Sequence, residues 1–409
     1  MKSRYRFAVI GLVFVFVFLF TDCRKTKTQD DAMSVRKREF IAENRVASYI
    51  RTWNIPSELQ QGNPYWNSDM VKAEYLTDLI IAFALIDRTD GSSIYIPQLR
   101  SRPQFSLWDE IAALKLKHPH LRVNLSVGGW GAEGFSDMTF NASLRSAFVS
   151  NVCDWLERYD LDGVDIDWEY PVGPAWGQEI KSRPQDRRNW IALLKDLRNA
   201  LNRLETEIGK RYSLSACIPA SEWFVSVNDT AAAAEIVDAL KLMAYDYYGS
   251  WSSTTGHHSN LYNNPDDPYN GGWSTDQALN AFLAANVPPE KIMLGFGFYG
   301  RAFGGVAPGP GGNGLYQPFG WLPFEFGSIS WDQLKELLKP DSGYTRYWDE
   351  KAKAPFLYNG DTWISYTDEE QIKLLCDYAK SKNLGGVFTW EYIHDIDAEL
   401  LQILYENSR

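Results

Sequence analysis

The sequence contains little cysteine and little histidine, with 4 Cys and 5 His among 409 residues. Cys153, Cys217 and Cys376 are widely spaced. This spacing favours buried small apolar residues over a disulfide framework or a metal site. No two histidines have the helical spacing of a zinc motif, so the sequence predicts no metal and no cofactor.

Positively charged residues are also fewer than negatively charged ones. Lys and Arg total 41 against 52 Asp and Glu, which gives a net charge of −11. Proteins that bind nucleic acids usually present a basic surface, so we expect no nucleic-acid partner. No G-x-G-x-x-G follows the first predicted strand, and the glycine-rich stretch Gly304–Gly314 lacks a following Gly-Lys-Ser/Thr. Dinucleotide and phosphate-cradle sites therefore have no sequence support.

The longest apolar run is too short to cross a membrane comfortably. Phe7–Phe20 has 14 residues, which as a helix would span about 21 Å of a hydrocarbon core of roughly 30 Å. Lys2, Arg4 and Arg6 precede this run, as in a secretory signal. Residues 1–23 are therefore predicted to be an export segment.

Cys23 follows the apolar run and resembles the lipidated cysteine of a bacterial lipoprotein signal, although Asp22 stands where such signals usually carry a small residue. Ordinary cleavage and an uncleaved anchor remain alternatives. The polar residues 24–45 are predicted to be a solvated tether. We expect an exported protein, secreted or held at the cell envelope by Cys23, that meets the membrane only through this anchor and is a monomer.

Aromatic residues, in contrast, are abundant, with 16 Trp, 22 Tyr and 21 Phe. Tryptophan at this density exceeds what a core needs, because the large ring is rarely buried completely. The surplus suggests flat apolar faces presented to a ligand, and sugar rings are one such ligand.

From residue 46 onward, short apolar strand patterns alternate with helical ones, which predicts a parallel α/β fold. Eight such units over this length favour a (β/α)8 TIM barrel over an open doubly wound sheet. The predicted strands are Val46–Trp53, Leu79–Ile86, Leu121–Val127, Gly163–Glu169, Tyr212–Ile218, Ala239–Asp246, Lys291–Phe298 and Gly385–Trp390; the predicted helices are Leu107–Lys117, Leu144–Tyr159, Asn189–Ile208, Asp276–Ala285 and Asp368–Lys382.

An unusually long interval separates the seventh and eighth strands. The stretch 301–362 is dense in Gly, Pro, Tyr and Trp, with one clear helical pattern at Trp331–Leu338. It is predicted to be a small α+β insertion domain at the C-terminal mouth of the barrel, where such enzymes keep their active sites. Residues 46–300 and 363–409 would then form the catalytic barrel.

Three carboxylates lie on one face of the fourth strand. Alternate side chains of a strand point the same way, so Asp165, Asp167 and Glu169 share one face, opposite Val164, Ile166 and Trp168. With the apolar face under the helices, the acids point into the barrel, and uncompensated burial of all of them would be costly. The alternatives are a solvated edge strand, which this alternation disfavours, and a calcium loop, which requires a glycine within the acidic run. Clustered acids with divergent pKa values are typical of acid–base catalysis, and Glu169, nearest the mouth, is the natural acid.

The run Asp162–Glu169 resembles the D-G-x-D-x-D-x-E signature of family 18 glycoside hydrolases, the chitinases, including bacterial members with an α+β insertion domain. Further matching motifs occur in order at the expected strand ends: Ser126-Val127-Gly128-Gly129, Met243-Ala244-Tyr245-Asp246, Phe298-Tyr299-Gly300-Arg301 and Trp390-Glu391-Tyr392. Gly297 stands where many relatives carry Pro.

The resemblance implies a role for each matching residue. Glu169 would protonate the glycosidic oxygen and then activate water, while Asp167 would alternate between Asp165 and the acetamido group of the substrate. Tyr245 would donate a hydrogen bond to the acetamido carbonyl. Further substrate contacts are expected from Met243, Asp246, Trp390, Tyr299, Arg301, Trp130 and Trp53.

The implied function is an endo-type chitinase that hydrolyses β-1,4 linkages between N-acetylglucosamine units, with retention of configuration and assistance from the substrate acetamido group. Its partners would be chitin or N-acetylglucosamine oligosaccharides. A family 18 glycosidase acting on peptidoglycan or N-glycans remains an alternative. So does a non-catalytic chitin-binding lectin, although such relatives usually lose the acid that stands here as Glu169.

Overall fold

Eight parallel strands form a closed barrel. The computed structural model describes residues 45–53, 67–101, 106–173, 180–269 and 273–409, all of which belong to the unit Glu43–Arg409. The sheet order is β1-β14-β8-β7-β6-β5-β4-β2, and β1 also pairs with β2, which closes the ring. The predicted (β/α)8 barrel is therefore confirmed. Its strands are β1 (Arg45–Arg51), β2 (Asp78–Ile86), β4 (Arg122–Gly128), β5 (Gly163–Asp167), β6 (Ser213–Pro219), β7 (Ala239–Met243), β8 (Ile292–Gly297) and β14 (Gly386–Trp390).

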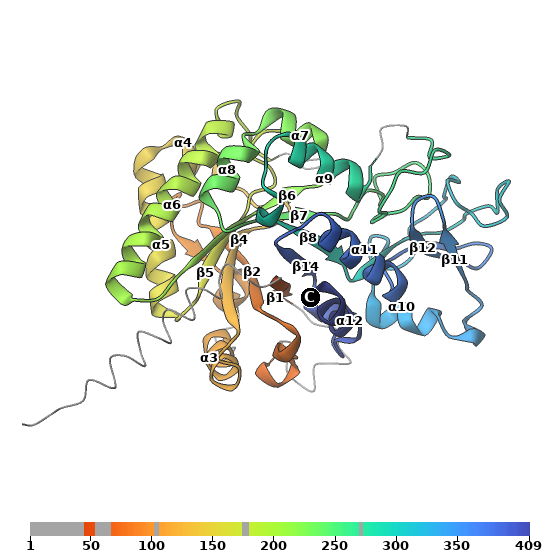
Figure 1. Cartoon of the computed structure of the whole chain (residues 1–409), viewed down its shortest axis with the longest axis horizontal. Helices are drawn as coiled ribbons and strands as arrows, with labels where there is room; N and C mark the ends of the chain where they lie inside the picture. The colour runs from red at the N-terminus through yellow and green to blue at the C-terminus, as the bar shows by residue number, and fades with distance from the viewer. Residues whose placement is uncertain (1–44, 54–66, 102–105, 174–179, 270–272) are drawn as a thin grey trace, which may run out of the picture. The chain divides into compact units, whose positions relative to one another are not determined.

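Helices cover the outside of the barrel, as Figure 1 shows for α4, α5, α6 and α8. In α6, apolar residues recur every three or four positions, so Trp190, Leu194 and Leu201 are all buried on one side. The helix ends at Gly209, whose positive φ of 76° is the usual left-handed stop. The helices between barrel strands are α2 (Pro97–Ser101), α3 (Leu107–Lys117), α4 (Phe135–Phe140), α5 (Ala142–Arg158), α6 (Asp186–Ile208), α7 (Glu222–Val227), α8 (Thr230–Ile236), α9 (Thr275–Ala284) and α11 (Glu369–Ser381), and α12 (Glu399–Ser408) follows the last strand.

Several short elements complete the barrel. Strand β3 (Ile94–Tyr95) pairs with the end of β2. The 3-10 turns are η2 (Ser68–Met70), η3 (Ala73–Tyr75), η4 (Pro289–Lys291), η5 (Pro340–Ser342) and η6 (Tyr392–His394).

A five-stranded antiparallel sheet lies between β8 and β14 in the sequence, with strand order β10-β9-β13-β12-β11. Only Phe298 separates β8 from the first of these strands. The sheet extends beyond both ends of the predicted insertion 301–362. Its elements are β9 (Tyr299–Phe303), β10 (Ser328–Ser330), α10 (Trp331–Leu337), β11 (Thr345–Asp349), β12 (Ala354–Tyr358) and β13 (Trp363–Ser365).

The insertion sheet packs against the segment that follows β7. Tyr247 and Tyr248 form one buried cluster with Phe303, Phe356 and Trp363 of the sheet. His257, in the same segment, is buried and contacts Asp349 of β11 through Nε2 and Oδ2 at 3.0 Å. The loop beyond one barrel strand is thereby fixed to the insertion.

The predicted export segment 1–23 and almost all of the tether 24–45 lie outside the described residues. Strand β1 begins at Arg45, so the last predicted tether residue belongs to the barrel. Within the described ranges, no helix combines the length and apolar character needed to cross a membrane.

Candidate active site

Asp165 lies buried inside the barrel among hydrogen-bond donors from neighbouring strands. Tyr49 Oη on β1 and Ser126 Oγ on β4 donate to Asp165 Oδ2 over 2.7 and 2.8 Å. Ser215 Oγ on β6 and Lys241 Nζ on β7 donate to Oδ1 over 2.7 and 2.9 Å. Burial would raise the pKa of Asp165, but the Lys241 charge and these hydrogen bonds outweigh burial and lower it. Asp165 is therefore an anion.

The other two acids of β5 have the opposite tendency. Burial, reinforced by the charges of Glu169 and Asp165, raises the pKa of Asp167 well above its ordinary value. Burial also raises the pKa of Glu169 to about 7, against a hydrogen bond with Tyr170 that lowers it. Glu169 lies just beyond the end of β5, whereas the sequence pattern placed it on the strand. Strand β5 and the residues directly after it thus carry one ionised acid, Asp165, followed by two acids that hold protons more tightly.

Asp246 is held by residues of the insertion sheet. Arg301 Nε and Nη2 donate to its two carboxylate oxygens over 2.8 and 2.7 Å, and Tyr299 Oη donates to Oδ1 over 2.7 Å. Burial would raise the pKa of Asp246, but the Arg301 guanidinium lowers it further than burial raises it. The backbone of Asp246 has a positive φ of 63°, and the chain turns away from the direction of β7 at this residue. Tyr299 and Arg301 were predicted to contact the substrate, and in the structure both bind Asp246.

Aromatic rings form the inner wall at the ends of β1, β2 and β14. Trp390 stacks on Phe83 with ring centroids 5.5 Å apart and planes inclined by 14°. Trp53 stacks on the same Phe83 ring at 6.1 Å. Met243 and Tyr245 pack with Trp53 and Trp390 against the apolar cluster inside the barrel. Predicted site residues at the ends of three barrel strands, β1, β7 and β14, are thus brought to one interior wall.

Two further tryptophans lie at the surface, and one of them, Trp130, was predicted to contact substrate. Trp130, just beyond β4, is 50% exposed. Trp251, after β7, is also exposed, and the Arg301 guanidinium lies 5.3 Å from its ring centroid. Such rings are available to a ligand because no core encloses them.

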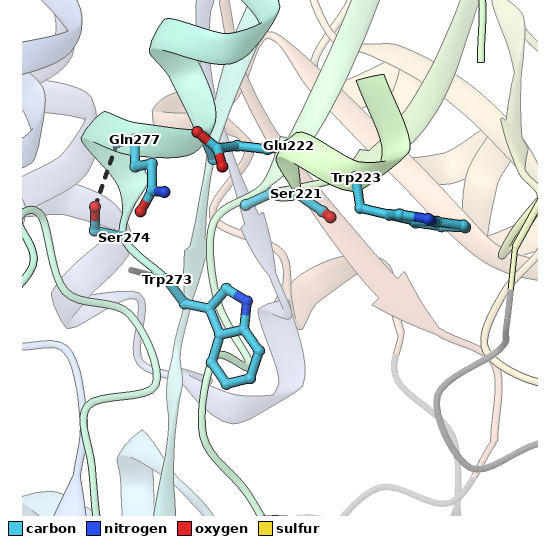
Figure 2. A pocket seen from close by; sticks show the side chains of 8 residues that line it. Ser221, Glu222, Trp223, Trp273, Ser274 and Gln277 are labelled. Atoms are coloured by element: carbon cyan, nitrogen blue, oxygen red, sulfur yellow. Dashed lines mark hydrogen bonds between the residues drawn. The ribbon is translucent and has the colours of Figure 1, made fainter. Parts of the chain in front are cut away.

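A hollow of about 210 Å³ opens beyond the end of β6. Trp223 and Trp273 line it together with Ser221, Glu222 and Gln277. Figure 2 shows both indole rings and the Glu222 carboxylate around this hollow. Trp223 also lies against the segment after Glu169, because a Cβ on Gly173 would come within 1.7 Å of its ring. The hollow therefore adjoins the loop that follows the acids.

Sequence reasoning missed several residues around Asp165, namely Tyr49, Ser215 and Lys241, and it missed the polar contacts of Cys217. Cys217 is buried as predicted, but its Sγ lies 2.9 Å from Tyr49 Oη and 3.5 Å from Asp165 Oδ2, so it is not merely an apolar filler. Burial raises the pKa of Cys217 well above its ordinary value, so the group is a neutral thiol. Lys241 carried a usable signal, because it shares the inward face of β7 with Met243.

Asp162 confirms the argument from strand parity. It points away from the acids, and its Oδ2 accepts the Val123 N–H of β4 over 2.8 Å. Lys115 and Lys210 pair with the same carboxylate. Asp162 therefore braces the start of β5 and lies outside the candidate site.

Comparison with known proteins decides the family. The family model described as Glycosyl hydrolases family 18 matches residues 45–395. The chain belongs to this family. It is 36% identical over 299 residues to Chitinase A1 from Niallia circulans, a match that covers 70% of this chain and 42% of the relative. It is 31% identical over 336 residues to Chitotriosidase-1 from Mus musculus, with 78% and 67% covered.

Solved structures of the family agree with the fold. A family 18 N-acetylglucosaminidase from Paenibacillus barengoltzii is 34% identical, with a TM-score of 0.77 over 89% of this chain and 100% of that one. Chitinase ChiA74 from Bacillus thuringiensis is 26% identical, with a TM-score of 0.78 over 90% of this chain and 70% of that one. As a family 18 member, the protein is a glycoside hydrolase.

Proposed function

We propose that the protein is a chitinase-type glycosidase that hydrolyses β-1,4 linkages between N-acetylglucosamine units. The observation that carries the proposal is the difference in protonation along β5. Asp165 is an anion, whereas burial favours the neutral forms of Asp167 and Glu169. A neutral carboxylic acid at the mouth is the group needed to protonate a leaving glycosidic oxygen.

The proposed mechanism is retaining and substrate-assisted, as the family implies. The carbonyl oxygen of the substrate acetamido group attacks the anomeric carbon, while Glu169 transfers its proton to the leaving oxygen. Glu169 then accepts a proton from water, which opens the cyclic intermediate with overall retention. Each proton transfer of this kind is worth on the order of 10²- to 10⁴-fold in rate.

Two further residues support the acetamido group in this proposal. Asp167, next to Glu169, would orient the N–H of this group by accepting a hydrogen bond from it. Tyr245 would donate a hydrogen bond to its carbonyl oxygen. Burial raises the pKa of Tyr245 well above its ordinary value. The hydroxyl is thus a neutral donor.

The substrate class rests on the aromatic wall and on the relatives. Sugar rings expose apolar C–H faces that pack on aromatic rings, and Trp390 and Trp53 present such rings beside the acids. Several relatives are named chitinases. The N-acetylglucosaminidase among the structural neighbours supports a second possibility, in which single sugars are removed from a chain end.

Product analysis on chitin hexasaccharide tests the proposal, with residues 45–409 or the full chain and with the anomers resolved. We expect the unmodified protein to release β-anomeric short oligosaccharides. Glu169→Gln should lose turnover by at least about 10²-fold while still binding the hexasaccharide. Release of α-anomers, or near-native turnover by Glu169→Gln, would contradict the mechanism.

The same digestion experiment distinguishes the alternative functions by their products. Internal cleavage gives dimers and trimers early, whereas action from a chain end gives monosaccharide from the first time point. Intact hexasaccharide together with cleavage of peptidoglycan or an N-glycan would reject chitin as the substrate. Tight binding without cleavage of any of these would indicate a lectin.

A further inference from the structure

Lys241 is a buried cation inside the barrel that the proposed catalytic steps do not use. It is 1% exposed, and its Nζ donates to Asp165 Oδ1 over 2.9 Å and to Ser215 Oγ over 3.0 Å. Nζ also lies 5.1 Å from the centroid of the Tyr49 ring. A buried cation is costly unless it is paired, so its partner Asp165 must remain charged as well.

The hydrogen bonds to Asp165 leave no room for an additional proton. A carboxylate offers about four lone-pair sites. Tyr49 and Ser126 use those of Oδ2, and Ser215 and Lys241 use those of Oδ1. The Cys217 thiol makes a further contact with Oδ2 at 3.5 Å. To receive a proton, Asp165 would have to release a donor and leave Lys241 buried beside a neutral acid.

Asp167 has the opposite surroundings. Within the described part of the chain, its buried Oδ1 has no hydrogen-bond partner. Burial and the charges of Glu169 and Asp165 raise its pKa, whereas a hydrogen bond with Cys217 on β6 and the charge of Lys241 on β7 lower it. The tyrosines whose pKa values its charge raises are Tyr49, Tyr170 and Tyr245. An unpartnered oxygen on a buried acid is better suited to a proton than the fully hydrogen-bonded carboxylate of Asp165.

We propose that Lys241 is a positioning residue that keeps Asp165 ionised, so that the proton held by these two aspartates stays on Asp167 and does not pass to Asp165. The inference rests on the proposed function and refines it. Asp167 is then the member of the pair that carries the proton when the acetamido group binds. Asp165 acts as a fixed negative charge beneath it.

The variant Lys241→Met tests this arrangement, because it removes the cation and keeps most of the volume. Loss of the charge should raise the pKa of Asp165 and of Asp167, since Lys241 lowers both. Both limbs of the pH profile of kcat/KM should therefore move to higher pH. The acid limb should move by about one to three pH units, because a neighbouring cation lowers an aspartate pKa by this amount. A rate loss that is equal at every pH would mean that Lys241 only supports the fold, and would overturn the proposal.

Lys291→Met is the matched control. Lys291 is a partly buried lysine whose Nζ donates to the Val237 carbonyl oxygen over 2.7 Å, below the opposite end of the barrel. This substitution should leave both pH limbs in place. Ser215→Ala removes one donor to Asp165 without removing the charge, and should shift the acid limb in the same direction by less.

A titration of the unmodified protein does not depend on turnover. In protein labelled with ¹³C at the aspartate carboxyl carbons, the Asp165 resonance, assigned by its absence in Asp165→Asn, should titrate below the ordinary aspartate range. The Asp167 resonance should titrate well above it. If Asp165 takes up a proton first, the inference is wrong even when the protein hydrolyses chitin. If the two titrations are as expected but no glycan is cleaved, only the proposed function fails.

Discussion

Arg301 forms a bidentate ion pair with Asp246, and this pair joins the insertion sheet to the end of a barrel strand. Arg301 lies on β9, whereas Asp246 follows β7 and is next to the proposed acetamido donor Tyr245. The insertion therefore positions part of the candidate site.

We expect Arg301→Met to lower kcat/KM by about 10- to 100-fold, because a small misplacement of positioning groups has effects of this size. Arg301→Lys should recover only part of the loss, since lysine cannot make the paired contact. Steady-state kinetics on a chitin oligosaccharide measures both. Arg346→Met, which removes another arginine ion pair of the insertion sheet, is the control. Equal activity of all three variants would show that the Asp246 contact is dispensable.

The raised pKa of Glu169 has a consequence for stability. Its value of about 7 in the folded protein exceeds the ordinary 4.5, so the folded state binds this proton more tightly than the unfolded state. The contribution of Glu169 to stability is then fully present below about pH 4.5 and is lost as the pH rises through about 7, a difference of about 3 kcal/mol at most.

Glu169→Gln should therefore be more stable than the unmodified protein at pH 8 and similar to it at pH 4. Urea unfolding at the two pH values checks this expectation. Glu325→Gln, which changes an exposed glutamate of the insertion, should show no such dependence. A Glu169→Gln protein that is less stable at pH 8 would contradict burial as the cause of the raised pKa.

Trp130→Ala should weaken the binding of long oligosaccharides without unfolding the protein. The ring is half exposed, and stacking of a sugar on such a ring contributes on the order of 1 kcal/mol. KM for the hexasaccharide should rise several-fold while Tm stays constant. Phe140→Ala, at an exposed aromatic residue on α4, serves as the control. An unchanged KM would exclude Trp130 from the binding surface.

Trp168→Ala should have the opposite effect. Trp168 is buried and stacks on Phe135 with centroids 5.2 Å apart, on the side of β5 that faces the helices. Loss of a large buried ring should cost about 3–5 kcal/mol of unfolding free energy, measured by urea titration. Trp168→Phe should cost less, and folded molecules of either variant should retain turnover. Loss of turnover in the folded Phe variant would show that the two faces of β5 are not independent.

The alternation of acids and apolar residues along β5 predicted the inward face of the candidate site correctly, because strand parity is a local property. Helix α3 was predicted with its observed bounds for a similar reason. Its apolar residues recur at helical spacing within the segment itself, so no contact with a distant part of the chain is needed to recognise it. Strand ends were less predictable: Glu169 and Asp246 were placed within strands but lie beyond them, at points where the chain turns.

The partners of the acids were harder to predict. Tyr49, Ser215 and Lys241 reach Asp165 from three different strands, and their convergence depends on barrel closure and register. The antiparallel sheet could not be delimited either. Strands β10 and β13 have three residues each, and β9 pairs with β13 across more than fifty residues of sequence. Pairings of this kind leave no periodic pattern in any one segment.

Strand β14 pairs with both β1 and β8, although it is the last strand of the barrel to be synthesised. Without residues 386–390 the barrel would be an open sheet with unpaired edges at β1 and β8. Water would then reach the acids, and the pKa of Asp167 and of Glu169 would lie closer to their ordinary values, because burial is the largest cause that raises both. The closure of the ring by its last strand is thus a condition for the protonation of the two acids.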